Sequence, residues 1–260
     1  MKYQLPLRIP EPKDPRLERA FFDYIEANML HDLPPKKAQL GGLLLDLMPS
    51  SGFVLEVGCG TGRDAFWYAQ KFPSHRVIAV DNYPNAISFA KKHYGTRLPN
   101  LEFRIDDIYE LARGYKDQAA IILASDTFHH LDNIEDALAQ IFESLKTPGT
   151  LLFSDLNRED LLKYPGTLVC EDGVELQVGE AMHLLRTHYS DNEILNKLFS
   201  GALFPGENIR DSVLNFILLM SLVAAYTPSE LYTSLKKVGF KKSLIVSSDE
   251  KGRYLGYALK

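Results

Sequence analysis

Three glycines within five positions follow a short apolar run, and they could bring backbone N–H groups against a ligand. The stretch L-E-V-G-C-G-T-G-R-D covers residues 55–64 and contains Gly58, Gly60 and Gly62. Glycine loses more conformational entropy on folding than any other residue, so an ordered tract of this kind must need its bare backbone. A strand that enters such a turn and leaves it as a helix presents N–H groups to a bound molecule.

The spacing of these glycines argues against a dinucleotide. They follow G-x-G-x-G, whereas the dinucleotide fingerprint is G-x-G-x-x-G, and Arg63 stands where the third glycine of that fingerprint would fall. Glu56, two residues before the first glycine, would oppose a pyrophosphate but would suit a ligand with a positive charge. A nicotinamide-dependent oxidoreductase is therefore the less favoured alternative.

A second acid, Asp81, comes directly after the apolar run Arg76–Val80. A carboxylate at the end of the second strand of a nucleotide-binding sheet accepts hydrogen bonds from ribose hydroxyls. Together with Glu56 it indicates adenosine with a cationic, amine-bearing tail and no phosphates. S-adenosylmethionine matches that description.

The elements that must position these residues alternate between short apolar runs and amphipathic helices. Five strands are predicted, at 53–57, 76–80, 101–105, 119–124 and 150–155. Asp132 and Glu135 predict a capping box for the helix before the fifth strand, and Pro148-Gly149 should end that helix. Such alternation predicts parallel strands covered by helices on both faces.

The ends of the chain depart from this alternation. Helical spacing predicts helices over residues 17–25 and 40–47, and the alternation stops for about seventy residues after the fifth strand. It resumes at a predicted cap, Thr227 to Glu230, and the chain then ends in two strands, the last of them antiparallel to its neighbour. We therefore expect a helical cap over 1–50, a core over 51–156 and 227–260, and a mainly helical insertion over 157–226.

Four motifs in this order give a family resemblance: V-L-E-V-G-C-G-T-G-R, V-I-A-V-D, I-D-D, and F-H-H-L after the fourth strand. They resemble the class I S-adenosylmethionine-dependent methyltransferase family of small-molecule type, over roughly residues 40–156 and 227–260. The resemblance implies a Rossmann-like, doubly wound, mostly parallel α/β sheet of about seven strands, with the last strand reversed.

The resemblance also implies roles for individual residues. Glu56 orients the methionine end of the cofactor, the three glycines let the loop approach it, and Asp81 binds the ribose hydroxyls. The other expected cofactor contacts are Arg63, Asn82, Tyr83, Asp107, Ile108, Ala124 and Ser125. Within I-D-D, either Asp106 or Asp107 could contact the adenine, and this choice stays open.

Methyl transfer itself requires mainly that an acceptor be placed in line with the S–CH₃ bond of a sulfonium, with water excluded. If the acceptor needs a base, His129, His130 or Tyr226 could serve. No metal is expected, because adjacent histidine side chains should point apart and no carboxylate stands at a ligand spacing from them. A catalytically silent S-adenosylmethionine-binding partner protein is the second alternative.

Composition restricts the partners. The formal net charge is −5 and the lysines and arginines are scattered, which disfavours nucleic acid, as does Ser125-Asp126-Thr127-Phe128 where adenine methyltransferases carry an Asn/Asp-Pro-Pro motif. The apolar run over 213–226 is too short to cross a membrane. Two cysteines in 260 residues and no signal-peptide pattern predict a cytoplasmic enzyme. Aromatic and aliphatic side chains, Phe216 and Met220 among them, dominate the segments expected beside the acceptor, which predicts a small, partly apolar acceptor. The oligomeric state is not predicted.

Overall fold

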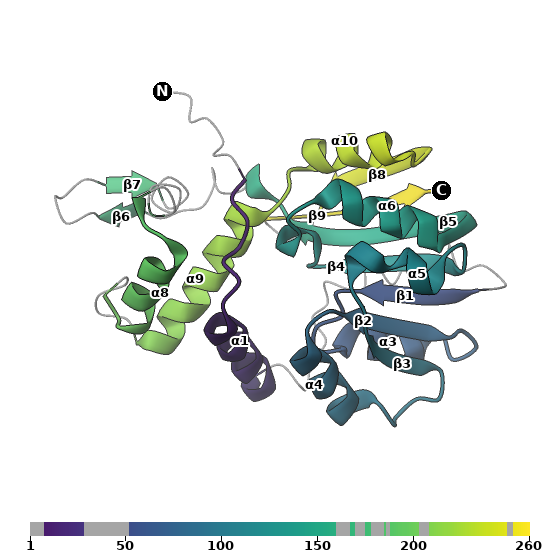
Figure 1. Cartoon of the computed structure of the whole chain (residues 1–260), viewed down its shortest axis with the longest axis horizontal. Coiled ribbons are helices and arrows are strands. Elements are labelled where there is room, and N and C mark those ends of the chain that lie inside the picture. Colours follow the sequence, from purple (N-terminus) through teal and green to yellow (C-terminus); the bar gives the residue numbers. More distant parts are fainter. Residues whose placement is uncertain are drawn as a thin grey trace.

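The computed structural model describes residues 8–28, 52–159, 167–169, 175–177, 185, 188–202, 208–248 and 252–260. Figure 1 shows a twisted sheet with its helices in one half of the molecule, and a smaller group of elements at one end of that sheet. The sheet positions the predicted cofactor residues, and the smaller group lies beyond the end to which β1 points.

Seven strands form the sheet, in the order β3-β2-β1-β4-β5-β9-β8. The first five in the chain pair in parallel, and β9 pairs antiparallel with both β5 and β8. This arrangement confirms the predicted doubly wound, mostly parallel sheet with a reversed last strand. The strands are β1 (Phe53–Val57), β2 (Val77–Asp81), β3 (Leu101–Ile105), β4 (Ala119–Ser125), β5 (Leu145–Leu156), β8 (Lys242–Ser247) and β9 (Arg253–Leu259).

Helices cover both faces of the sheet because the central strands are buried on both sides. One apolar cluster packs α3 (Arg63–Lys71) and α4 (Pro84–Tyr94) against the sheet. The other packs α5 (Ala112–Tyr115), α6 (Ile134–Ser144) and α10 (Pro228–Val238) against the opposite face. Two 3₁₀ turns, η1 (Ile108–Glu110) and η2 (Phe128–His130), follow β3 and β4. They carry two of the predicted motifs.

Two details of the predicted core were wrong. The N-cap of α6 is Asn133, whose side-chain oxygen accepts from the N–H groups of Glu135 and Asp136, while Asp132 pairs with Lys13 at 2.6 Å. The predicted break at Pro148-Gly149 lies inside β5, which already begins at Leu145. The reason is a shift in register: β4 pairs first with Leu145 and then, two residues later, with Thr150, so the residues between them bulge from the ladder.

The smaller group contains α1 (Pro15–Asn28), α8 (Asp191–Phe199), α9 (Ile209–Ala224) and an antiparallel pair, β6 (Thr167–Val169) and β7 (Glu175–Gln177). The helix predicted over 17–25 is confirmed as α1, whereas the one predicted over 40–47 lies outside the described residues. The pair β6–β7 was not predicted. A third apolar cluster joins α1, α8 and α9 through side chains such as Leu17, Leu195 and Phe216. Among the helices that the structure describes, none is both long and apolar enough to cross a membrane.

Candidate functional site

The register of the sheet brings the ends of four parallel strands to one edge. Val57 at the end of β1 lies opposite Val80 on one side and Ala124 on the other. Asp81 at the end of β2 lies opposite Ile105 of β3. The predicted cofactor residues follow these strand ends, so the fold gathers them along the carboxyl edge, where α/β sheets bind ligands.

All three glycines of the turn have positive φ, but their surroundings differ. At Gly58 (φ 66°) an added Cβ would lie 2.6 Å from the Thr127 side chain, and at Gly62 (φ 76°) it would lie 2.6 Å from Phe103. At Gly60 (φ 50°) it would meet no atom within 4 Å. Gly58 and Gly62 therefore serve close packing, whereas Gly60 faces open space in which a ligand can approach the backbone.

Asp81 ties the glycine turn to β2. Its Oδ2 accepts from the Gly60 N–H at 2.8 Å and its Oδ1 accepts from the Tyr83 N–H at 2.9 Å. Burial raises the pKa of this carboxyl, and these two hydrogen bonds oppose that rise. Each carboxylate oxygen can accept a second hydrogen bond, so Asp81 can hold the turn and still bind a ligand hydroxyl.

The structure separates the roles of Asp106 and Asp107. Asp106 Oδ2 accepts from the Tyr115 hydroxyl at 2.7 Å, which ties Asp106 to the end of α5. Asp107 caps η1 by accepting from the Tyr109 N–H at 2.9 Å, and its residue is exposed. Ile108, the first residue of η1, follows it. Asp107 is thus the better placed of the two acids for contact with a ligand.

The remaining predicted contacts lie on the same edge. Glu56 is 2% exposed within β1, and Ala124 and Ser125 are buried at the end of β4. Arg63 is the first residue of α3 and is half-buried, while Asn82 is exposed directly after β2. Glu56 is thus a buried acid in a central strand of the sheet, which is unusual because burial penalises a charge unless something compensates it.

Two of the three candidate bases come together at η2, and each has an acidic partner. His129 is 4% exposed, and its Nδ1 lies 2.6 Å from Oδ1 of Asp155, a buried residue of β5. Burial alone would lower the pKa of His129, but the charge and hydrogen bond of Asp155 outweigh it and raise that pKa. Since a carboxylate only accepts, Nδ1 carries a proton, and in the neutral ring Nε2 keeps its lone pair.

His130 is more exposed, and its partner comes from the far N-terminal part of the chain. Its Nδ1 lies 2.5 Å from Oε2 of Glu11, whose Oε1 accepts from the Ser221 hydroxyl of α9. Burial raises the pKa of Glu11, yet the charge and hydrogen bond of His130 bring it down to about 2. Glu11 is therefore ionised. Neither Glu11 nor Asp155 was predicted as a site residue. Glu11 is a single acid between two prolines, and no sequence motif marks such an acid as part of a site.

The expectation that the two histidine side chains point apart is wrong. Their rings lie 3.9 Å apart between centroids, and Glu11 contributes the carboxylate that sequence spacing did not reveal. Ligand atoms of Glu11, His129 and His130 all lie within 4.8 Å of one another. Both reasons for expecting no metal at these residues are thereby removed.

Tyr226, the third candidate base, contacts a backbone carbonyl and an arginine rather than an acid. Its hydroxyl donates to the Leu131 carbonyl at 3.1 Å, and the Arg8 guanidinium lies 4.2 Å from its ring centroid. Burial raises its pKa. With Arg8 and α10 it lines a hollow of about 420 Å³. A buried phenol that already donates its proton is poorly suited to accept one from a substrate.

Residues 8–14, which we call the strap, connect η2 to α9. Arg8 donates to the carbonyls of Leu131 at 2.5 Å, Ala224 at 2.6 Å and His129 at 3.2 Å, and Lys13 pairs with Asp132. Figure 1 shows the strap running alongside α9 before it enters α1. The strap therefore places Glu11 beside the two histidines.

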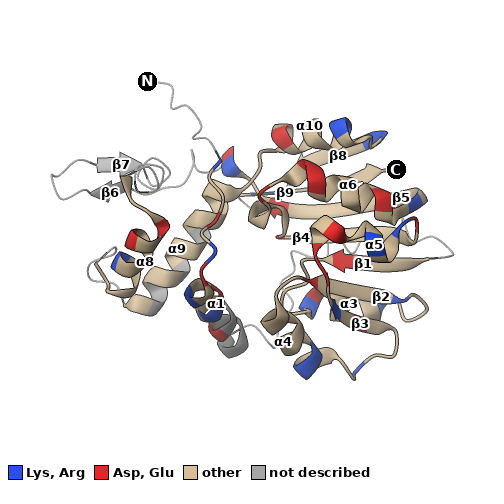
Figure 2. Cartoon of the chain, viewed as in Figure 1, with Lys and Arg blue, Asp and Glu red and all other residues tan. Residues whose placement is uncertain are grey.

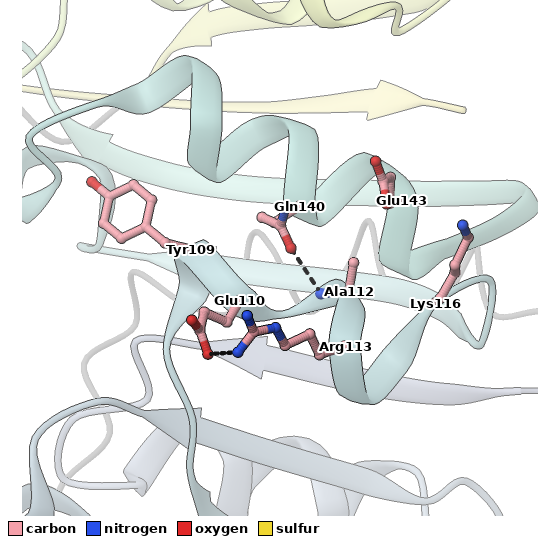
Figure 3. A pocket seen from close by; sticks show the side chains of 7 residues that line it. All are labelled: Tyr109, Glu110, Ala112, Arg113, Lys116, Gln140 and Glu143. Atoms are coloured by element: carbon pink, nitrogen blue, oxygen red, sulfur yellow. Dashed lines mark hydrogen bonds and ion pairs between the residues drawn. The ribbon is translucent and has the colours of Figure 1, made fainter.

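A second hollow, of about 360 Å³, lies between η1, α5 and α6 (Figure 3). Four of the lining residues are engaged with each other: Glu110 pairs with Arg113 at 2.7 Å, and Gln140 accepts from the Ala112 N–H at 3.1 Å. None of its lining residues is a predicted site residue. Figure 2 shows lysine and arginine interspersed with acids over the described elements, rather than gathered in a stripe for nucleic acid.

Comparison with known proteins defines the class of protein that has this fold and this arrangement of residues at the carboxyl edge of the sheet. A family of methyltransferase domains matches residues 50–239, and the chain belongs to this family. It is a class I S-adenosylmethionine-dependent methyltransferase domain, as the sequence motifs predicted, and S-adenosylmethionine is the cofactor of that class.

Individual relatives show how far the likeness extends. The chain is 31% identical over 106 residues to a malonyl-[acyl-carrier protein] O-methyltransferase of Bacillus cereus, covering 41% of this chain and 38% of that protein. It is 34% identical over 116 residues to a phosphoethanolamine N-methyltransferase of Triticum aestivum, covering 44% of this chain and 22% of that one. The chain thus spans well under half the length of these relatives.

Solved structures show the same fold over almost the whole chain. The plantazolicin methyltransferase BpumL in complex with SAH aligns with a TM-score of 0.63 at 14% identity, covering 95% of this chain and 91% of that one. A SAM-dependent methyltransferase from Aquifex aeolicus aligns with a TM-score of 0.57 at 15% identity, covering 95% and 99%. The nicotinamide alternative receives no support from these likenesses.

Proposed function

We propose that this protein transfers the methyl group of S-adenosylmethionine to a small, partly apolar acceptor. The observation that carries the proposal is the pairing of Asp81 with the open face of Gly60: a half-buried carboxylate, already fixed by two N–H groups, beside a backbone that a ligand can approach. A nucleoside with vicinal hydroxyls and a cationic tail fits this pairing, and the family match supports the same cofactor.

Residue roles follow from position along the carboxyl edge. Asp81 binds the ribose hydroxyls and Asp107 accepts from the adenine amino group, with Ile108 offering its backbone N–H. Glu56 orients the cationic methionine end near the turn. The further contacts we propose are Gly58, Gly60 and Gly62 of the turn, Arg63 at the start of α3, Asn82 and Tyr83 beside the adenine, and Ala124 and Ser125 at the methionine amine.

The acceptor is proposed to bind where η2 meets the strap and α9, under a cap formed by residues 1–50 and the insertion 157–226. The acceptor nucleophile attacks the methyl carbon in line, the S–CH₃ bond breaks, and its electron pair stays on sulfur as S-adenosylhomocysteine leaves. His129 and His130 face this region, whereas Tyr226 is held by Leu131 and Arg8. We further propose a cytoplasmic location, from the two cysteines of the chain, and no nucleic-acid partner.

Isothermal titration with S-adenosylmethionine, S-adenosylhomocysteine and NAD⁺ tests the cofactor. We expect both sulfur compounds to bind and NAD⁺ to give no heat of binding. Release of S-adenosylhomocysteine is then measured over a panel of phenols, amines, thiols and carboxylic acids. Turnover with one class supports an enzyme; tight cofactor binding without turnover across the panel supports the catalytically silent partner protein instead.

The affinity for S-adenosylmethionine should fall as the pH is lowered. Burial raises the pKa of Asp81 in the free protein, and ribose hydroxyls that donate to the carboxylate would lower it again in the complex. A group whose pKa is lower in the complex releases its proton on binding, so affinity rises with pH and is lost in acid. Titration calorimetry from about pH 7.5 to about pH 5 measures this trend.

The matched control for this trend is Asp81→Asn, which cannot ionise. Its weaker affinity should change less over the same pH range than that of the wild type. Equal pH dependence in both proteins would remove Asp81 from the binding site.

A further inference from the structure

Three side chains from two distant parts of the chain meet beside η2. His129 and His130 come from η2 itself, and Glu11 comes from the strap, 119 positions away from His130. One ligand atom from each lies within 4.8 Å of the other two. Two imidazoles and one carboxylate are the donor set of many catalytic zinc sites, which leave at least one coordination position for another ligand.

We propose that Glu11, His129 and His130 bind a divalent cation of the zinc type. The inference about the cation rests on this geometry alone; its part in methyl transfer rests on the proposed function. In a tetrahedral zinc site, with bonds of about 2.0–2.1 Å, ligand atoms lie about 3.4 Å apart. Binding of the cation would therefore require side-chain rotation to bring the three atoms to that separation, and the exposed side chain of His130 has room to rotate.

An independent observation behind one ligand supports the site. The Nδ1 of His129 donates to Asp155 at 2.6 Å, and Asp155 is itself held by the N–H groups of Phe128 at 2.7 Å and Leu156 at 2.7 Å. Histidines that bind metals through one ring nitrogen commonly donate the other to a carboxylate, which fixes the ring. Here that carboxylate is buried and prevents the His129 ring from turning, so Nε2 is the ligand atom.

The charges around the cluster also favour a cation. Two carboxylates, Glu11 and Asp155, surround two imidazoles that are neutral when they bind a metal, so a divalent cation balances the group. The nearby cations are engaged elsewhere: the Arg8 guanidinium binds three carbonyls, and Lys13 pairs with Asp132. Mixed nitrogen and oxygen donors select zinc, cobalt or nickel over magnesium and calcium, which prefer oxygen.

The cation would lie on the acceptor side of the site. The turn η2 directly follows β4, whose end lies beside the end of β1, so the cluster stands at the carboxyl edge of the sheet. An acceptor O–H, N–H or S–H group bound at the open coordination position loses its proton to solvent more readily, and its lone pair then attacks the methyl carbon. A histidine that binds the metal cannot take that proton, so His129 and His130 act as ligands rather than bases in this state.

Cobalt(II) titration of the purified, chelator-treated full chain tests the site, because bound Co²⁺ in a low-symmetry nitrogen and oxygen site absorbs visible light. We expect one Co²⁺ per chain, displaced by Zn²⁺, in the absence of S-adenosylmethionine. Glu11→Gln and His130→Ala should weaken Co²⁺ binding by at least about tenfold, and Asp155→Asn by about 10- to 100-fold. His75→Ala, which removes a half-buried histidine beside Ser74 at the amino end of β2, should bind Co²⁺ like the wild type.

Binding of S-adenosylhomocysteine is measured on every variant. It shows whether the variant is still folded, and it tests the proposed cofactor site separately from the cation site. A Glu11→Gln or His130→Ala protein that binds S-adenosylhomocysteine normally but has lost Co²⁺ supports the cation site. Unchanged Co²⁺ binding in both variants, or no visible spectrum in the wild type, overturns it. If Co²⁺ binds as expected while S-adenosylhomocysteine does not, the cation site stands and the proposed methyl transfer fails.

Discussion

Replacing Asp81 with alanine is expected to lower the affinity for S-adenosylmethionine by about tenfold to hundredfold, since a charged hydrogen bond contributes about 1.5–3 kcal/mol. The variant removes the acceptor for the ribose hydroxyls and also releases the N–H groups of Gly60 and Tyr83. Titration calorimetry with S-adenosylmethionine and S-adenosylhomocysteine measures the change. Both ligands share the ribose, so both should weaken to the same extent.

Two further variants separate binding from folding. Asp81→Asn keeps the shape and one carbonyl acceptor, so it should retain the fold and still lose most of the affinity. Glu102→Gln makes the same change of charge on β3, where Glu102 pairs with Arg76 and Arg104 away from the glycine turn. It should bind the cofactor like the wild type. An Asp81→Ala protein that is folded and binds with unchanged affinity would contradict the assignment of the ribose site.

The second large effect is expected within the glycine turn, where alanine should destabilise the fold to different extents at two nearby glycines. At Gly62 the new Cβ would lie 2.6 Å from Phe103 and 2.7 Å from Ala90 at a φ of 76°, so we expect the free energy of unfolding to fall by about 2–4 kcal/mol. At Gly60 the space is open, so we expect a loss of only about 1 kcal/mol, from the left-handed backbone alone.

For cofactor affinity we expect the reverse order, with a larger loss in Gly60→Ala than in Gly62→Ala. The methyl group of Gly60→Ala enters the space where the ligand approaches the turn, and we expect it to weaken binding by about tenfold. Gly62→Ala, studied at a temperature at which it remains folded, should bind more nearly like the wild type. Urea unfolding and titration calorimetry on the pair give both rankings. A Gly60→Ala protein with wild-type affinity would mean that the cofactor does not contact this part of the turn.

Much of the sheet could be predicted because its signals are local. Runs such as Phe53–Val57 and Leu101–Ile105 are bounded by turn residues, and the structure places both strands at these residues. The capping box at Thr227 is confirmed for the same reason, since the cap and its partner Glu230 are three residues apart. Where two neighbouring residues could both cap, as at Asp132 and Asn133, the pattern chose the wrong one.

The acceptor side could not be predicted in the same way because its contacts are not local. Glu11 reaches His130 only after the strap has been placed along α9, and Asp155 reaches His129 because β5 lies beside β4. Two apolar side chains expected near the acceptor, Phe216 and Met220, are instead buried among α1, α8 and α9. Helical spacing shows that one face of α9 is apolar, but it does not show which element covers that face.

The position of β9 has a consequence for how the protein folds during synthesis. Among the strands of the sheet β9 is made last, yet it lies between β5 and β8 and hydrogen-bonds to both. While β9 is still inside the ribosome, β8 has no neighbouring strand in this sheet and β5 has an unpaired edge, a state that invites pairing with other chains. The nascent protein therefore completes its sheet only after β9 has left the ribosome, and a pause in synthesis before that point would favour aggregation.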